Sequence, residues 1–146
     1  ETRPSVVKGI EMFHKLLDQG QAGDNVGISL SNTRREDLKR GMVIAHPGSV
    51  TTCEETKVDM YILTHQEGGR HKPFSTGFKP QFFLRTLDIT GTLNLPEGHD
   101  RAMPGDLIQG ATVHLYHPVA LEVGLLFAVR HSEQTIGAGM ITEVLN

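Results

Sequence analysis

VDMYI, residues 58–62, alternates apolar and polar side chains with a period of two. In an extended chain this alternation places the apolar side chains on one face and the polar side chains on the other. The apolar members are Val58, Met60 and Ile62, and they alternate with Asp59 and Tyr61. The pattern therefore predicts a half-buried β-strand whose apolar face packs on a core.

Further strand-like runs recur along the chain and are separated by turn residues. We place them at residues 6–7, 10–13, 25–30, 42–45, 81–96, 111–116, 125–130 and 135–145. The run 81–96 is interpreted as one strand that is kinked near Gly91. A single helical turn is expected within 32–41, capped by Asn32 or Thr33 and ended by Gly41. Repeated short strands between turns predict an all-β chain.

The expected boundary between two parts of the chain lies at residues 48–52. Residues 50–146 are numerous enough to form a closed small barrel. Residues 1–49 contain few strands, and a short β segment of that kind is marginal as an independent domain. We therefore expect the barrel to be the more stable part.

The composition sets limits on function. Apolar residues make up 38% of the 146 residues and charged residues 21%, which permits a packed core. The formal net charge is −3, so nucleic-acid binding requires a local basic surface. Cys53 is the only cysteine, which excludes an internal disulfide and fits a reducing compartment. We expect no membrane span, and we expect that a segment was removed before Glu1, because the chain lacks an initiator Met.

Motifs for catalysis, nucleotide binding or metal binding are absent from the sequence. There is no G-x-x-x-x-G-K-[ST] loop, and GQAGDNVG, residues 20–27, contains no lysine. His114 and His117 are three residues apart, so on a strand they face opposite sides and cannot share a metal. No G-x-S-x-G elbow occurs, although a triad assembled by the fold stays open. We therefore predict no catalytic residue and no metal site, and we interpret the histidines as surface or partly packed residues.

The stretch EGGRHKPF, residues 67–74, combines two glycines, three basic residues and a proline. Lys79 and Arg85 follow within the next residues, and Gln81 and Thr90 add uncharged hydrogen-bond donors. Such charges form either a solvated face or a surface that neutralises RNA phosphates while the uncharged donors bind sugars. A second mixed set consists of Glu11, Phe13, His14 and Asn25, and periodicity alone favours a core Phe13 with solvated neighbours.

Nine motifs in order carry a family resemblance. They are GIEMFHK, AGDNVG, REDLKRG, EGGRHKPF, KPQFFLRT, DITGT, LPEG, MPGD and TIGAG, and together they span nearly the whole chain. The sequence closely resembles the C-terminal half of translation elongation factor Tu, in which a GTPase domain precedes two β-barrels. The resemblance implies that residues 1–49 are the later part of the second domain and that residues 50–146 are the complete third, antiparallel barrel domain.

The resemblance assigns RNA contacts to the third domain. Arg70 and His71 match a loop that meets the T-stem backbone of aminoacyl-tRNA, and Gln81 and Thr90 match positions on the same stem. His131 and Ser132 occupy a T-stem site at which bacterial members typically carry Glu-Gly. The glycines before Arg70 would supply the bend that lets the basic residues reach the phosphates.

In the second domain, Glu11, Phe13, His14 and Asn25 match the pocket for the aminoacylated 3′ end of tRNA. Glu11 would lie by the terminal ribose and adenine. The Phe13 backbone and the Asn25 side chain would meet the α-amino group, and His14 would face the ester carbonyl. Bacterial members usually have Arg at the position of His14, whereas mitochondrial members share EMFHK, so a mitochondrial matrix protein is favoured over one of the bacterial cytoplasm.

The resemblance also implies partners. Gly68 and Ala128 match the side of the third domain that packs against the GTPase domain. The partners implied are aminoacyl-tRNA, the ribosome, the exchange factor elongation factor Ts and the protein's own GTPase domain, with no membrane. GTP and magnesium would belong to that absent domain, so the chain itself is expected to bind no cofactor and to have no enzymatic activity. The alternatives are a barrel that docks an exchange factor and, as the weakest, a hydrolase.

Overall fold

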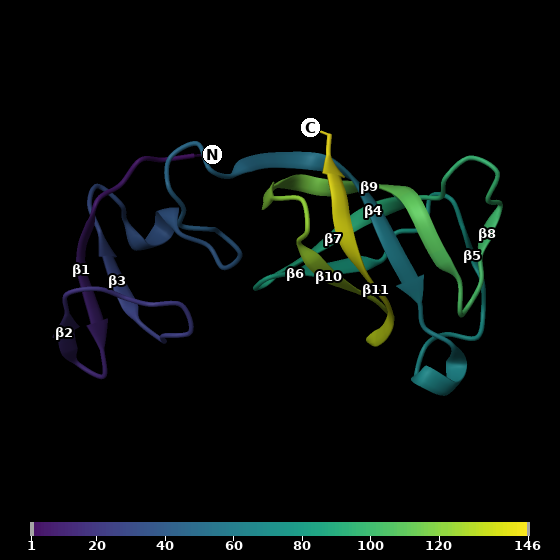
Figure 1. Cartoon of the computed structure of the whole chain (residues 1–146), viewed down its shortest axis with the longest axis horizontal. Coiled ribbons are helices and arrows are strands. Elements are labelled where there is room, and N and C mark those ends of the chain that lie inside the picture. Colours follow the sequence, from purple (N-terminus) through teal and green to yellow (C-terminus); the bar gives the residue numbers. More distant parts are fainter. Residues whose placement is uncertain (1, 146) are drawn as a thin grey trace. The chain divides into compact units, whose positions relative to one another are not determined.

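The computed structural model describes residues 2–145, which are all-β apart from two short 3-10 turns (Figure 1). The chain divides into two compact units, residues 1–39 and residues 40–146. No helix in the described residues is long and apolar enough to cross a membrane. The predicted all-β class is confirmed.

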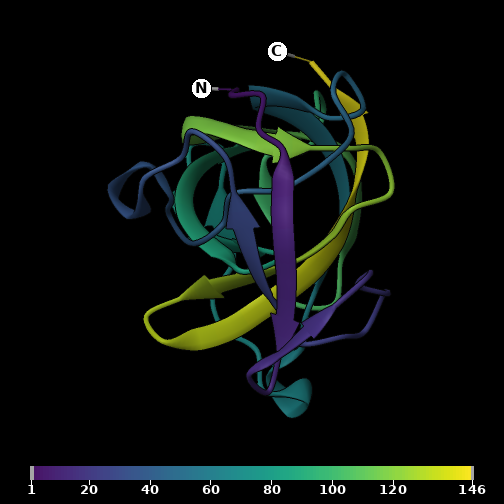
Figure 2. The ribbon, with the colours of Figure 1, turned by 90° about the vertical axis from the view of Figure 1, so that its left-hand side faces the viewer.

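The first unit is an open antiparallel sheet of strands β1 (Val7–Met12), β2 (Lys15–Leu17) and β3 (Gly27–Leu30), in the order β2-β1-β3 (Figure 2). None of its described residues, 2–39, is buried. The helical turn is shorter than predicted and spans η1 (Arg35–Asp37). Neither Asn32 nor Thr33 caps it, because the Asp37 carboxylate accepts the hydrogen bond of the Arg34 N–H at 3.0 Å.

The second unit is a closed barrel with the strand order β10-β11-β4-β9-β7-β6. Its strands are β4 (Thr51–Ile62), β6 (Gln81–Leu84), β7 (Leu87–Asn94), β9 (Leu107–Leu121), β10 (Leu126–His131) and β11 (Gln134–Val144). All neighbouring strands pair antiparallel. Three short elements lie at one end, namely η2 (His65–Glu67), β5 (Phe74–Ser75) and β8 (Arg101–Ala102) (Figure 1).

The barrel interior is filled by apolar side chains from every strand. The predicted alternation in β4 is confirmed, since Val58, Met60 and Ile62 are at most 1% exposed. A cavity inside the barrel measures about 10 Å³, which is at the lower limit for one water molecule. This interior is a packed core, so side chains that could bind a ligand lie on the outside of the barrel.

Two details of the predicted strands are wrong. The run 81–96 is a hairpin in which β6 pairs with β7, with Leu84 opposite Leu87. The chain reverses at Arg85, whose φ of 53° is left-handed. Gly91 does not kink a strand but lies within β7, where an added Cβ would be 3.0 Å from the Phe82 ring. Residues 42–45 form no strand.

Candidate nucleic-acid interface

The loop before the basic residues makes a sharp bend at two glycines. Gly68 has a φ of 93°, a left-handed conformation that glycine adopts without steric cost. Gly69 is buried against Leu63, and a Cβ at Gly69 would lie 2.4 Å from the Leu63 carbonyl oxygen. Both glycines are therefore required where they stand, and the bend directs the chain into Arg70.

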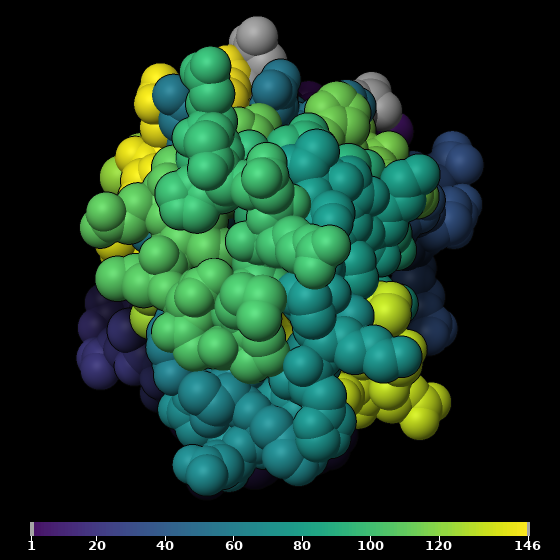
Figure 3. All heavy atoms as spheres, turned by 90° about the vertical axis from the view of Figure 1, so that its right-hand side faces the viewer, coloured from purple at the N-terminus to yellow at the C-terminus, as the bar shows by residue number. Residues whose placement is uncertain are grey.

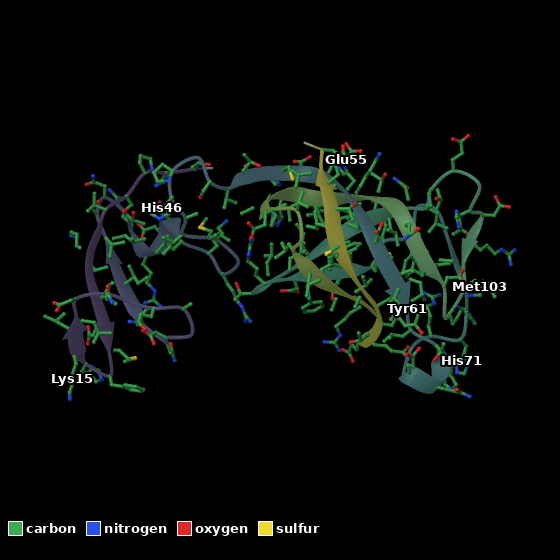
Figure 4. The ribbon with its side chains drawn as sticks, viewed as in Figure 1. Lys15, His46, Glu55, Tyr61, His71 and Met103 are labelled. Atoms are coloured by element: carbon green, nitrogen blue, oxygen red, sulfur yellow. The ribbon has the colours of Figure 1, made fainter. Side chains whose placement is uncertain are left out.

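A carboxylate fixes the turn that precedes this bend. Oε1 of Glu67 accepts hydrogen bonds from the Tyr61 hydroxyl at 2.6 Å, the Thr64 N–H at 3.0 Å and the Thr64 hydroxyl at 2.9 Å. The Tyr61 hydrogen bond is the main reason why the pKa of Glu67 is lowered and the pKa of Tyr61 is raised. Figure 4 shows Tyr61 at the η2 end of the barrel and Glu55 at the opposite end. The turn is thus tied to the barrel wall.

A second tie joins the loop to the β10–β11 hairpin. Nε2 of Gln134 donates hydrogen bonds to the carbonyl oxygens of Gly68 at 2.7 Å and Gly69 at 2.9 Å. Gln134 pairs with His131 across the hairpin, and Ser132 and Glu133 form its left-handed turn with φ values of 50° and 63°. The loop that carries Arg70 and the hairpin that carries His131 and Ser132 are therefore held side by side.

Arg70 lies over aromatic rings between these two segments. Its guanidinium carbon is 5.0 Å from the centroid of the Phe78 ring and 5.9 Å from that of Phe74. The Phe78 ring in turn contacts the His131 ring, with centroids 4.8 Å apart. Nη1 of Arg70 is buried and has no hydrogen-bond partner among the described residues. Stacking on these rings therefore orients a half-buried guanidinium whose Nη1 points into the protein.

Polar side chains continue across the barrel wall in one row. Gln81 of β6 pairs with Thr90 of β7 on one side and with Arg130 of β10 on the other. Gln81 is exposed, and Thr90 and Arg130 are half-buried. The Arg130 guanidinium carbon lies 5.6 Å from the Phe83 ring centroid, and its Nη2 donates to the Glu133 carbonyl oxygen at 2.7 Å. Arg130 was not predicted from the sequence, because a single arginine within a strand does not reveal which residues lie beside it in the folded sheet.

Not every basic residue between Arg70 and Arg85 lies beside Gln81 and Thr90. Arg85 lies in the β6–β7 turn, where it bonds the Ala120 carbonyl oxygen at 2.8 Å and the Glu122 carboxylate at 2.7 Å. Arg85 is thus neutralised locally, at the end of β6 remote from Gln81. His71 is exposed and stacks on His65 with ring centroids 3.5 Å apart.

The first unit presents its predicted residues on a hairpin tip. Phe13 and His14 form the two-residue turn between β1 and β2, with φ values of 52° and 64°. Phe13 is 84% exposed, so the interpretation of Phe13 as a core residue is wrong. Nδ1 of His14 lies 3.5 Å from Oε1 of Glu11. Glu11 pairs with Gly27 of β3, which brings Asn25, two residues before Gly27, toward the same end of the sheet.

Two family profiles match the chain. The profile described as elongation factor Tu C-terminal domain matches residues 49–145, and the profile described as elongation factor Tu domain 2 matches residues 1–45. The first match alone covers more than half of the chain. The chain belongs to the elongation factor Tu family. Its closed antiparallel barrel agrees with the family resemblance read from the motifs.

The two matches establish the coarse role. Together they leave only residues 46–48 and 146 unmatched, so the 146 residues are a C-terminal part of an elongation factor of translation. Among the residues assigned to tRNA by the elongation factor Tu resemblance, the structure brings together Arg70 with His131, and Gln81 with Thr90. Gly68 and Ala128 lie on separate elements, because Gly68 caps the end of η2 and Ala128 lies in the middle of β10.

Proposed function

We propose that this chain supplies the tRNA-binding surfaces of an elongation factor that delivers aminoacyl-tRNA to the ribosome under the control of GTP. In the barrel, the RNA-binding surface consists of Arg70, His71, Gln81, Thr90, His131 and Ser132, with Arg130 as an addition from the structure. The observation that carries the proposal is the stacked guanidinium of Arg70, which is fixed beside the β10–β11 hairpin that carries His131. Cations neutralise phosphates, and Gln and Thr donate to sugar and phosphate oxygens, which are the contacts that a helical RNA backbone requires.

The exposed hairpin of the first unit fits the aminoacylated 3′ end. Glu11, Phe13, His14 and Asn25 are solvent-exposed and thus accessible to a ligand. We propose that the Asn25 amide oxygen accepts a hydrogen bond from the free α-amino group. An N-blocked amino acid would leave that oxygen unpaired, and a site of this kind rejects such an analogue. The His14 motif also leads us to propose a mitochondrial location.

We propose that GTP and magnesium bind to a part of the full-length factor other than these 146 residues. The chain has no loop of the phosphate-binding type, so its own residues do not fit a nucleotide. We propose that the GTPase domain of the full-length factor binds the nucleotide and that this chain does not hydrolyse it. The contact with that domain would include Gly68 and Ala128.

The proposal is tested with Arg70→Gln in the full-length factor. A backbone contact carries no direct sequence information, so the substitution should weaken binding of many aminoacyl-tRNA species alike. The loss of one phosphate contact should also make the slope of log affinity against log salt shallower by about one. Unchanged affinity together with an unchanged slope would remove Arg70 from the RNA interface.

A second candidate function is docking of an exchange factor, and a specific surface favours it. Leu126 and Met140 pair across β10 and β11 and are 70% and 40% exposed, and Ala128 pairs with Ala138 beside them. Exposed apolar side chains gathered on a barrel wall are typical of a protein interface. Titration of this chain with elongation factor Ts and with aminoacyl-tRNA separates the two functions. Met140→Glu should weaken binding of elongation factor Ts and leave binding of aminoacyl-tRNA unchanged.

A further inference from the structure

The β5–β8 ribbon places an arginine beside the basic loop. Phe74 pairs with Ala102 and Ser75 pairs with Arg101 in this antiparallel ribbon. Phe74 and Ala102 are at most 5% exposed, so their side chains turn into the core, and the alternate residues Ser75 and Arg101 turn to solvent. Figure 3 shows this end of the second unit, where green and teal segments lie side by side.

Arg101 belongs to a group of cations on this end of the second unit, which we call the four-cation surface. Its members are Arg70, Lys72, Lys79 and Arg101. The Arg70 guanidinium carbon lies 5.9 Å from the centroid of the Phe74 ring in β5. Arg101 lies opposite Ser75, the residue that follows Phe74. Lys79 directly follows Phe78, whose ring stacks on Phe74 with centroids 4.5 Å apart. Phe74 thus links the segments that carry these cations.

Two basic residues elsewhere in the second unit are paired with carboxylates. Arg85 is paired with Glu122 at 2.7 Å, and Lys57 with Glu143 at 3.8 Å. No ion pair within the described residues involves a member of the four-cation surface. Unneutralised like charges in one region repel one another, and a polyanion relieves that repulsion by displacing its counterions.

We infer that Arg101 is a further RNA-phosphate contact, which extends the barrel's RNA-binding surface onto the β5–β8 ribbon. The inference rests on the proposed function, because it names an additional residue for the same RNA. The ligand is a run of phosphates, since exposed guanidinium and ammonium groups bind phosphates. The resemblance to elongation factor Tu assigned no contact to this ribbon.

The test measures the salt dependence of aminoacyl-tRNA binding by the full-length, GTP-bound factor and three variants. They are Arg101→Gln, Arg70→Gln and, as the matched control for loss of one charge, Lys57→Gln on the outer face of β4. Six to ten phosphate contacts cost about 10³–10⁵ in affinity between about 50 and 200 mM salt, so one contact accounts for about threefold. Arg101→Gln should therefore bind more weakly than the wild type at 50 mM salt, and that difference should shrink about threefold at 200 mM.

The outcomes separate this inference from the proposed function. Shallow slopes for Arg101→Gln and Arg70→Gln, with a wild-type slope for Lys57→Gln, support both. A wild-type slope for Arg101→Gln beside a shallow slope for Arg70→Gln overturns the inference and leaves the proposed function standing. If all three variants keep the wild-type slope, both are overturned. Equal changes in Arg101→Gln and Lys57→Gln indicate a net-charge effect and also overturn the inference.

Discussion

The Tyr61 hydroxyl donates a 2.6 Å hydrogen bond to Oε1 of Glu67, and this contact connects the barrel wall to the turn that leads into the basic loop. It lowers the pKa of Glu67 from 4.5 and raises the pKa of Tyr61 from 10.0. The contribution of Glu67 to the free energy of unfolding is present above the ordinary carboxyl pKa and is lost as pH falls through the lowered value. The contribution of Tyr61 to the free energy of unfolding is present below pH 10 and is lost as pH rises through the raised pKa.

The first prediction follows from this pair. Tyr61→Phe removes the donor, so the pKa of Glu67 should rise toward its ordinary value and the turn should loosen at a higher pH during acidification. The carboxyl resonance of Glu67, titrated by NMR in both proteins, measures this shift directly. Glu97→Gln, a change in an exposed carboxylate elsewhere in the second unit, serves as the control. Identical Glu67 titrations in wild type and Tyr61→Phe would show that the hydroxyl does not act on this carboxylate.

The second prediction concerns the hydrogen bonds of Gln134 to Gly68 and Gly69. Gln134→Ala should release the loop, at a cost of about 1 kcal/mol for a hydrogen bond of this kind. Exchange of the Gly69 amide hydrogen, which bonds the Thr64 carbonyl oxygen at 2.8 Å, should become several-fold faster. Gln109→Ala, an exposed glutamine on β9, should leave that amide unchanged. Equal exchange in the two variants would mean that Gln134 does not hold the loop.

The sequence predicted the barrel well where burial alone decides the structure. The alternation at 58–62 produced the correct strand because one face of β4 is fully buried. The β6–β7 turn was missed because Arg85, which has a left-handed backbone, is neither glycine nor asparagine, and the partners of its side chain, Ala120 and Glu122, are distant in the sequence. Such tertiary support leaves no local signal in the chain.

The candidate site shows the same division. The residues in EGGRHKPF were recognisable as a bent basic loop, but its tie to Gln134 joins segments 65 and 66 residues apart. Arg85 is close to Arg70 in the sequence, but the fold pairs it with Glu122 instead. Arg101 became a candidate only when the ribbon placed it opposite Ser75.

The third prediction concerns the stability of the first unit. Its described residues contain no buried side chain, and its sheet ends in two edge strands, β2 and β3. Sheets of this kind fray when no partner covers them. In the 146-residue chain, amide hydrogens of residues 7–30 should exchange faster than those of β4 and β11. Uniform protection of both units in a proven monomer would contradict this expectation.

The fourth prediction concerns His14, which is fully exposed at the tip of the β1–β2 hairpin. Arginine stays charged at every relevant pH and is the stronger donor to a carbonyl oxygen, with charged donors contributing about 1.5–3 kcal/mol against 0.5–1.5 for neutral ones. His14→Arg in the full-length factor should therefore bind aminoacyl-tRNA several-fold more tightly at pH 8. Protection of the aminoacyl ester from hydrolysis measures the affinity. Lys15→Arg tests for a general effect of arginine on the hairpin, and equal protection in His14→Arg and the wild type would place His14 outside the pocket.

The central claim is that the wall formed by β6, β7 and β10 lies on the backbone of the T-stem. Site-specific photo-crosslinking tests it most directly, with a benzophenone side chain introduced at exposed Gln81 of the full-length factor and, as the control, at Lys57. The account predicts that the probe at position 81 crosslinks to T-stem nucleotides of bound aminoacyl-tRNA and that the probe at position 57 does not. Crosslinks from position 81 that fall outside the T-stem, or that are no stronger than those from position 57, would contradict it.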